Sequence, residues 1–394
     1  MPATEYQSSS HVPLAFFGSI LSIRRNHVVI AVDSTQEQEL HDLDNFQRNV
    51  ADRFLRLSLD EKTQVLSLPW LQSLLQEFLL CLEEFQSLII PAHSNPATPA
   101  GRRGSFHDRL VAELLDRAVK ALDVCNAVSN GVDSILDCHR QAQIAVSALE
   151  QRPLGEAHLR RAKRALANLV AVLDEKEEGG RTTDRNWSFG RKQASGMSPA
   201  AAKARHSRSL SWSVSRMWSA AKQLQAMASN LYPPRAAEAG TLASPIYTMS
   251  TVLVFVMWVL VATIPCQDRG SMAVNFPVPP RHLPWASPLI ALHDKVAEEW
   301  RKKEKNSRGG TGLLPELQKL EKSSHGLLDL TPQSSEEDIK TQARELAETC
   351  SRLEEGLIPF QRRIREVFHR IIRNRTEVLD CLGEAVRSSS MSGV

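Results

Sequence analysis

The stretch that decides the fold is Ile246–Ile264, IYTMSTVLVFVMWVLVATI, which contains no charged residue and no Gly, Pro, Asn or Gln. A helix of this length, rising about 1.5 Å per residue, covers roughly 28 Å and so approaches the ~30 Å hydrocarbon core of a bilayer. Ser244 is the expected N-cap, with Pro245 in the first turn. Pro265 is expected to end the helix, because it disfavours helical geometry at the preceding Ile264.

Two environments fit this segment, because apolar side chains surround the whole expected helix and must be enclosed on every side. It is either inserted in a membrane or buried as the central helix of a bundle, since its length is near the lower limit for a span. A strand is disfavoured because the run is far longer than a usual strand. If lipid encloses the segment, the residues facing it include Ile246, Val254, Phe255, Val256, Trp258 and Ile264.

The rest of the 394-residue chain predicts an all-α protein, because Leu and Ala are abundant, aromatics make up 6% and apolar residues recur at helical spacing. We expect two amphipathic helical halves, joined by a basic disordered linker and one central hydrophobic helix. The expected domains are an N-terminal bundle (1–174), a disordered linker (175–212), a basic amphipathic helix (213–232), the hydrophobic helix (244–265), a Pro-rich connector (266–287), a C-terminal helical region (288–384) and a disordered tail (385–394).

Within the two halves, apolar spacing and breaks predict the individual helices. In the N-terminal half they are stripes over 40–57 and 71–89, the second ending at Pro91, and helices over 106–127, 132–149 and 156–173. In the C-terminal half they begin near Leu289, cover 313–330, run from a cap at Ser334 or Ser335 to Pro359, and cover 364–382.

The region before the hydrophobic segment is strongly basic. Between residues 181 and 235, ten Lys and Arg face the single acid Asp184, a local charge of +9. Basic residues combined with Trp and Met on a helix suit an anionic membrane surface, although a packed bundle helix fits the same pattern. The predicted contacts to the membrane surface are Arg205, Arg208, Arg216 and Lys222.

Regulatory modification is indicated in two places. Ser105 follows Arg102-Arg103 in a loop rich in Pro and Gly, a pattern that a basophilic kinase accepts. An unmodified polar loop of ordinary composition fits the same residues. Phosphate at Ser105 would lie at the start of the next expected helix, where negative charge is favoured. Ser209 and Ser211 in the basic stretch are further candidate phosphorylation sites.

The sequence carries no motif of a known active site: HExxH, GxSxG, GxGxxG and GxxxxGK[ST] are all missing. Glu83-Glu84 and Glu336-Glu337 are typical of a solvated face or a helix cap, and His139 on an apolar face is typical of a packed core residue. The six cysteines form no CxxC pair and predict reduced thiols. We therefore expect a non-enzymatic protein without catalytic residues, cofactor, metal, small-molecule substrate or nucleic-acid partner.

Three stretches in order resemble one known family. They are FFGSILSIRR (16–25), SRSLSWSVSRMWSAAKQLQAMASNLYPPR (207–235) and the hydrophobic run after them, and together they are similar to the plant BYPASS-related proteins of the ROH-type branch. The resemblance implies a helical, membrane-associated or cytosolic protein. ROH-type members are linked to the exocyst through its Exo-seventy subunits and so to polarised secretion. BYPASS-type members are linked instead to restraint of a mobile root-derived signal in development.

These observations predict a membrane protein, single-pass or peripheral, with a cytosolic pool and a place at plasma-membrane secretion sites. The C-terminal half carries Arg362, Arg363 and the reduced-looking Cys350 and Cys381, which are typical of cytosolic helices. We therefore expect both halves to face the cytosol, with the hydrophobic segment dipping into the membrane or shielded by the bundle.

Overall fold

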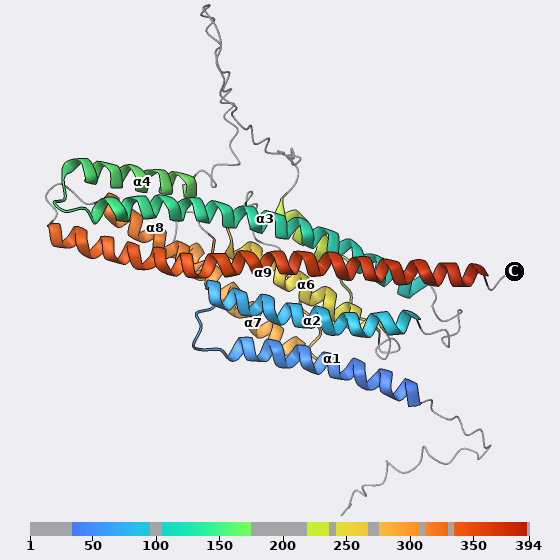
Figure 1. Ribbon diagram of the computed structural model, residues 1–394. Coiled ribbons are helices and arrows are strands. Elements are labelled where there is room, and N and C mark those ends of the chain that lie inside the picture. Colours follow the sequence, from blue (N-terminus) through green and yellow to red (C-terminus); the bar gives the residue numbers. More distant parts are fainter. Residues whose placement is uncertain are drawn as a thin grey trace, which may run out of the picture. The chain divides into compact units, whose positions relative to one another are not determined.

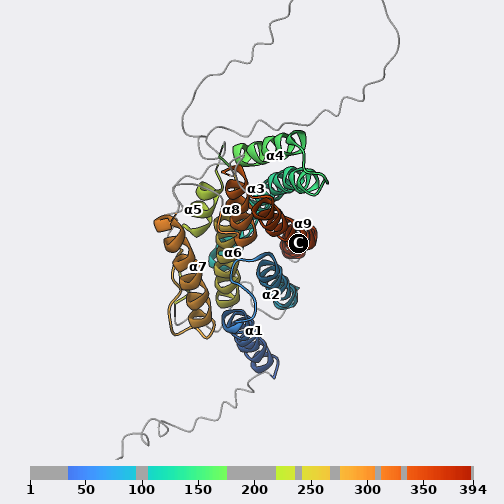
Figure 2. The same cartoon turned by 90° about the vertical axis from the view of Figure 1, so that its left-hand side faces the viewer.

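A computed structural model describes residues 34–94, 105–174, 219–235, 242–266, 276–306, 312–329 and 335–391, and these residues contain helices and no strand. The all-α class predicted from the sequence is therefore confirmed. Residues 1–40 form one unit and residues 41–394 form a second, which contains the hydrophobic core. The helices labelled in Figures 1 and 2 are α1 (Ser34–Leu59), α2 (Leu68–Ser94), α3 (Ser105–Leu149), α4 (Glu156–Asp174), α5 (Ala220–Ala228), α6 (Ala243–Thr263), α7 (Ala286–Asn306), α8 (Pro315–Leu328) and α9 (Glu336–Met391).

Helix α6 is the predicted hydrophobic segment, and protein encloses it. Every side chain from Ala243 to Thr263 is buried except that of Val261. Helices α2, α3, α5 and α7 contact α6, and α1 reaches it through Phe54, whose ring meets the edge of Phe255 at a centroid distance of 5.9 Å. Figure 2 shows α6 between α7 and α2. Among the described residues, α6 is also the one helix long and apolar enough to cross a membrane.

The three threonines of α6 are accommodated within the helix itself. Thr248, Thr251 and Thr263 each donate a hydrogen bond to the carbonyl four residues earlier, at 2.7–2.9 Å. Such bonds satisfy a hydroxyl in an apolar environment without a partner from another element. The predicted capping role of Ser244 is wrong: α6 begins one residue earlier, and the Ser244 hydroxyl accepts a hydrogen bond from Gln47 of α1 at 2.6 Å. The predicted end is confirmed, because Ile264 is the extended C-cap residue.

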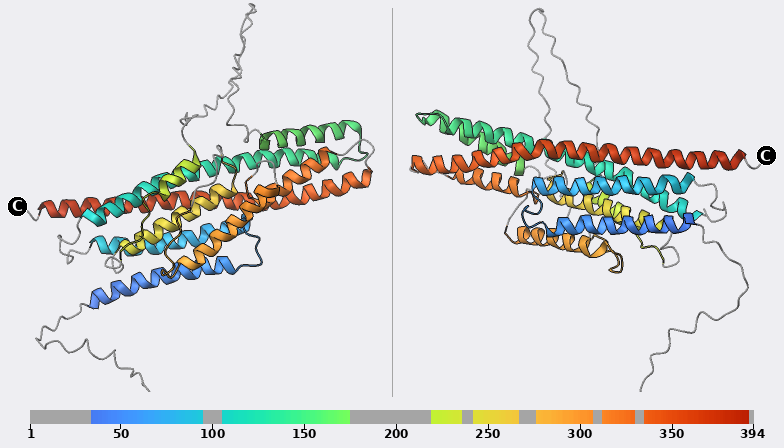
Figure 3. Two further views of the ribbon diagram at one scale, coloured as in Figure 1. Left: turned by 180° about the vertical axis from the view of Figure 1, so that it is seen from behind. Right: turned by 60° about the horizontal axis from the view of Figure 1, so that its bottom comes forward.

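Helices from both sides of α6 in the sequence pack against each other. Helix α9 lies along α2 and α3, and α4 contacts α8 (Figures 1 and 3). The buried apolar side chains of these helices belong to one cluster that also contains α6. The two halves expected from the sequence therefore share one core.

Two helices are longer than the sequence predicted. Residues 106–149 were expected to break near 130, yet α3 runs unbroken from Ser105 to Leu149. Likewise α9 passes through Pro359, where a stop was expected, and continues to Met391, so that 385–391 are helical rather than part of a tail. Residues on each side of Pro359, such as Leu357 and Phe360, are fully buried, and their packing offsets the missing backbone hydrogen bond.

Smaller differences affect the ends of α2 and α5. Helix α2 continues past Pro91 to Ser94. Of the predicted helix 213–232, residues 213–218 lie outside the described residues, and α5 covers Ala220–Ala228, so that 229–232 are not helical. Its N-cap Ser219 accepts a hydrogen bond from the Lys222 amide at 3.2 Å. At the start of α9 the predicted cap is confirmed, because the Ser335 hydroxyl accepts from the Asp338 amide at 3.1 Å. The predicted linker 175–212 lies outside the described residues.

Two glycines mark places where backbones cross closely. A Cβ at Gly131 of α3 would lie 2.7 Å from both the Ile264 side chain and the Pro265 carbonyl oxygen. A Cβ at Gly312 would lie 2.1 Å from the Thr263 carbonyl oxygen. Nothing larger than hydrogen fits at either position. The C-terminal end of α6 therefore packs directly against the backbone of α3 on one side and of the segment before α8 on the other.

Candidate functional site

The residues predicted to face lipid lie inside the protein. Val254, Phe255, Val256 and Trp258 are at most 7% exposed in the middle of α6, and Ile246 and Ile264 are buried at its two ends. The same six residues therefore supply the centre of the core.

Most of the other predicted site residues cannot be placed. Arg205, Arg208, Arg216, Ser209 and Ser211 lie outside the described residues. Lys222 is exposed on α5. Ser105 is the first residue of α3, where a phosphate would meet the helix N-terminus, and its modification stays a prediction.

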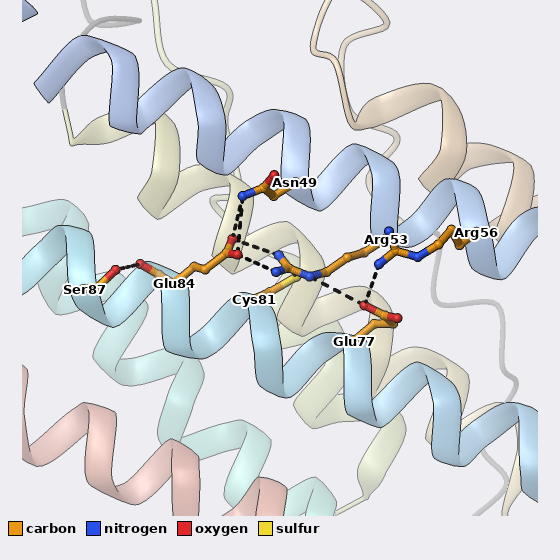
Figure 4. Close-up of polar contacts among 7 residues, drawn as sticks. All are labelled: Asn49, Arg53, Arg56, Glu77, Cys81, Glu84 and Ser87. Carbon is orange, nitrogen blue, oxygen red and sulfur yellow. Dashed lines mark hydrogen bonds and ion pairs between the residues drawn. The ribbon is translucent and has the colours of Figure 1, made fainter. Parts of the chain in front are cut away.

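A cluster of charged side chains lies between α1 and α2 (Figure 4). Arg53, whose side chain is 12% exposed, forms two hydrogen bonds with the carboxylate of Glu84 and an ion pair with Glu77 at 3.5 Å. Asn49 donates to Glu84 at 3.4 Å, and Arg56 approaches Glu77 at 3.4 Å. The fork of Arg53 thus ties two carboxylates of α2, one a turn before Cys81 and the other a turn after it, to α1.

The cluster shifts the titration of its members. The hydrogen bonds with Glu84 raise the pKa of Arg53, and the same bonds hold the pKa of the Glu84 carboxyl below its ordinary value. Burial raises the pKa of Cys81 to about 12, although Arg53 opposes this shift. The thiol is therefore protonated at neutral pH and is not a nucleophile.

Other buried or partly buried polar groups also join elements that are distant in sequence. Glu316 of α8 accepts a hydrogen bond from the Leu68 amide at 3.1 Å and so caps the N-terminus of α2. Arg117 of α3 donates to the Met227 and Asn230 carbonyls, at 3.0 and 3.1 Å, and so closes the C-terminal end of α5. His139 donates from Nε2 to the Cys350 carbonyl at 3.1 Å, joining α3 to α9.

Burial changes the pKa of several of these groups. It raises the pKa of the Glu316 carboxyl and lowers that of Arg117, which the nearby Glu113 partly counteracts. Burial also raises the pKa of the Cys125 and Cys350 thiols to about 12. The prediction of reduced thiols agrees with five described cysteines that are buried and free, while the Cys381 side chain lies outside the described part of the chain.

A cavity of about 260 Å³ opens between α3, the segment after α5 and α6. Its lining includes Arg109, Arg117, Tyr232, Tyr247 and Ser250. Glu113 neutralises part of its positive charge by pairing with Arg109 at 2.9 Å and Arg117 at 3.6 Å. Within the part of the chain that the structure describes, no group of three His, Cys, Asp or Glu side chains is placed to hold a metal ion.

Sequence reasoning missed the Arg53 cluster, and it read Glu84 as a solvated or capping residue. A signal existed: Arg53 stands between Val50 and Phe54 on the buried stripe of α1, and Glu84 precedes Phe85 on that of α2. A charge beside a buried stripe implies a partner, but the stripe alone does not say which helix supplies it.

Comparison with known proteins extends over the whole chain. The family model described as Protein ROH1-like matches residues 1–382. Protein ROH1A of Arabidopsis thaliana is 45% identical, with 99% of both chains covered. Protein ROH1D of the same plant is 43% identical, with 98% of this chain and 99% of the relative covered. No solved structure matches. The resemblance read from three stretches of sequence is thus confirmed, and the chain belongs to the ROH1-like family.

Proposed function

We propose that this protein is a non-enzymatic helical adaptor that binds an exocyst subunit of the Exo-seventy type and thereby acts in polarised secretion. Two things support the proposal. Membership of the ROH1-like family extends over nearly the full length of the chain. The ROH-type resemblance carries the link to the exocyst.

The observation that carries the adaptor part is how the buried reactive groups are used. Arg53, Arg117, His139 and Glu316 each bond a different helix or its backbone. Cys81 has a pKa far above neutrality. These groups hold the helices in place, and this use in packing supports a role in recognition at the surface.

We also propose that the protein associates with membranes peripherally. If α6 crossed a bilayer, α2 and α9 would lie on opposite sides of it, because α6 separates them in the sequence. The packing of α9 along α2, and the burial of α6 in the shared core, support a position on one side. The membrane is then contacted by the basic stretch 181–235, in which each Lys or Arg near an anionic surface contributes about 1 kcal/mol to binding.

Binding of purified full-length protein to a purified Exo-seventy-type subunit tests the partner. We expect saturable 1:1 binding in calorimetry. A BYPASS-type developmental regulator without a secretory partner would give no heat of binding, and that result would refute the proposal. The triple variant Arg205→Gln, Arg208→Gln and Arg216→Gln is the control, because it should weaken binding to anionic vesicles while leaving the subunit's affinity unchanged.

Topology is tested on sealed vesicles with tags at both ends. A peripheral protein loses both tags to added protease and leaves the membrane in an alkaline carbonate wash. Protection of the C-terminal tag alone would show a true span and overturn the peripheral position. Glycosylation at Asn374 would do the same, because Asn374-Arg375-Thr376 matches the acceptor pattern used in the lumen.

A further inference from the structure

Helix α9 carries a row of exposed side chains that spans much of its C-terminal half. The inward face of this part is buried, at residues such as Leu357, Phe360 and Ile364. The outward face presents, at alternating spacings of four and three, Ile358, Arg362, Arg365, His369, Ile372, Thr376 and Leu379. We call these seven residues the outer row.

The apolar members of the outer row are exposed to solvent. Ile358 is 52% exposed, and Ile372 and Leu379 are each 39% exposed. Together with Arg365 they recur every seven residues, the period that keeps side chains facing a partner helix. From Ile358 to Leu379 the row is roughly 31 Å long at 1.5 Å per residue.

The row lies on the most basic part of α9. From Arg362 to Arg375 there are six Arg and one acid, Glu366, which gives six minus one, or +5, with His369 neutral. Glu366 pairs with Arg363 at 2.7 Å, and Arg373 pairs with Glu377 at 3.0 Å. Within the described part of the chain, Arg362 and Arg365 form no ion pair.

Among the described residues, no ion pair joins the arginines of 362–375 to another helix. Beside the start of the row, Asp133 of α3 accepts a hydrogen bond from Gln361 at 3.0 Å rather than from an arginine. On the α2 side, Asn374 donates to the Leu82 carbonyl at 3.3 Å, so the contact there is also uncharged. The exposed arginines of the row therefore keep their full charge toward solvent.

We propose that the outer row of α9 binds an acidic amphipathic helix of a partner protein, laid along α9 in a coiled-coil-like pair. The apolar residues at seven-residue spacing contact the apolar seam of the partner, and Arg362 and Arg365 pair with its flanking carboxylates. That this partner is the exocyst subunit rests on the proposed function. The surface and the chemistry of its ligand rest on α9 alone.

A partner helix fits these observations better than a lipid surface does. A helix that lies in a membrane interface inserts a broad apolar face of Leu, Phe or Trp. The outer row instead offers three aliphatic side chains in a narrow line, with Glu366 and Asp380 beside it. A narrow apolar seam flanked by charges of mixed sign is typical of helix pairing, in which the charges fix partner and register.

The test compares two charge-reversed variants of the full-length protein. The first, Arg362→Glu with Arg365→Glu, alters the outer row. The matched control, Arg161→Glu with Arg164→Glu, changes net charge equally at the same spacing on exposed positions of α4. Circular dichroism and thermal melting verify that both variants fold.

Three probes are used. They are the Exo-seventy-type subunit, a fluorescent synthetic amphipathic helix with a Leu seam flanked by Glu, and vesicles with or without anionic lipid. We expect the outer-row variant to bind the peptide or the subunit at least about tenfold more weakly than wild type, and the control to bind within about twofold. High salt should weaken wild-type binding as well.

The outcomes separate this proposal from the proposed function. If the peptide binds through the outer row but the subunit does not bind at all, the surface stands and the exocyst partner fails. If the subunit binds wild type and the outer-row variant equally, the exocyst partner stands and the surface is refuted. Three other results would also refute the surface: equal losses in both variants, failure of both the peptide and the subunit to bind wild type, or a variant defect confined to anionic vesicles.

Discussion

Replacing Phe255 by Ala tests whether α6 is enclosed by the protein core or by lipid. Phe255 is fully buried, and its ring contacts Phe54, Trp258 and Phe276 at centroid distances of 5.9, 6.2 and 5.6 Å. Truncating a buried Phe to Ala costs about 3–5 kcal/mol, which includes the cavity left behind. Two of the contacts are edge-to-face at 70°, a geometry that adds roughly 0.5–1.5 kcal/mol per pair.

The melting temperature converts this cost into a measurement. For a helical unit of this size the entropy of unfolding is on the order of 0.6–0.7 kcal/mol/K, so a loss of about 4 kcal/mol lowers Tm by roughly 6 °C. The assay is thermal unfolding of purified protein in detergent-free buffer, followed by circular dichroism.

The matched control is Val261→Ala, because Val261 is the one side chain of α6 that is not buried. We expect its Tm to move by about 1 °C at most. If both variants melt within about 1 °C of wild type, α6 does not form the core and the reasoning is refuted. A protein that is soluble only in detergent would refute it equally.

Three other contacts can be tested with single substitutions or labelling. Because Arg53 depresses the pKa of Glu84, the pair stabilises the fold at neutral pH and loses this contribution as pH falls through the folded-state pKa of Glu84. In Arg53→Met the free energy of unfolding should therefore fall less steeply as the solution is acidified, and an unchanged acid dependence would contradict this. Gly356→Ala should lower the free energy of unfolding in urea by about 1–3 kcal/mol, because the new Cβ would lie 2.7 Å from the Leu68 side chain. Adding Leu68→Ala to the same chain should recover part of this loss, whereas additive losses would show that the two side chains do not contact each other. Cys81 should react with iodoacetamide at pH 8 only after denaturation, because burial raises its pKa to about 12; labelling of the native protein at the rate of free cysteine would rule this out.

Most helices could be predicted from local pattern, because apolar spacing and caps are local properties. For this reason the start of α9 at the Ser335 cap and the end of α6 before Pro265 are both predicted correctly. The break expected near residue 130 is absent, and α3 continues through Gly131, whose lack of a side chain is required by packing. This glycine makes room for Ile264 and Pro265, which lie more than 130 residues away in the sequence.

The polar core was harder to predict than the helices. The Arg53 pairing with Glu84 and the Glu316 cap on α2 depend on which helices become neighbours, and periodicity carries no information on that. For the same reason the sequence left two environments open for α6. An all-round apolar helix must be enclosed, but its composition does not distinguish lipid from a neighbouring helix.

The central position of α6 has a consequence for synthesis of the chain on the ribosome. Its last residue, Thr263, is followed by 394 minus 263, or 131, residues, which include α7, α8 and α9. At about 5–20 residues per second, translation of these takes roughly 7–26 s, during which α6 lacks the partners that come after it in the sequence. Throughout that interval a nascent apolar helix of 21 residues presents a substrate for chaperones and for the membrane-insertion machinery. The rate at which α7–α9 emerge therefore competes with targeting, and slowing translation after residue 263 should divert more of the newly made chains to the membrane.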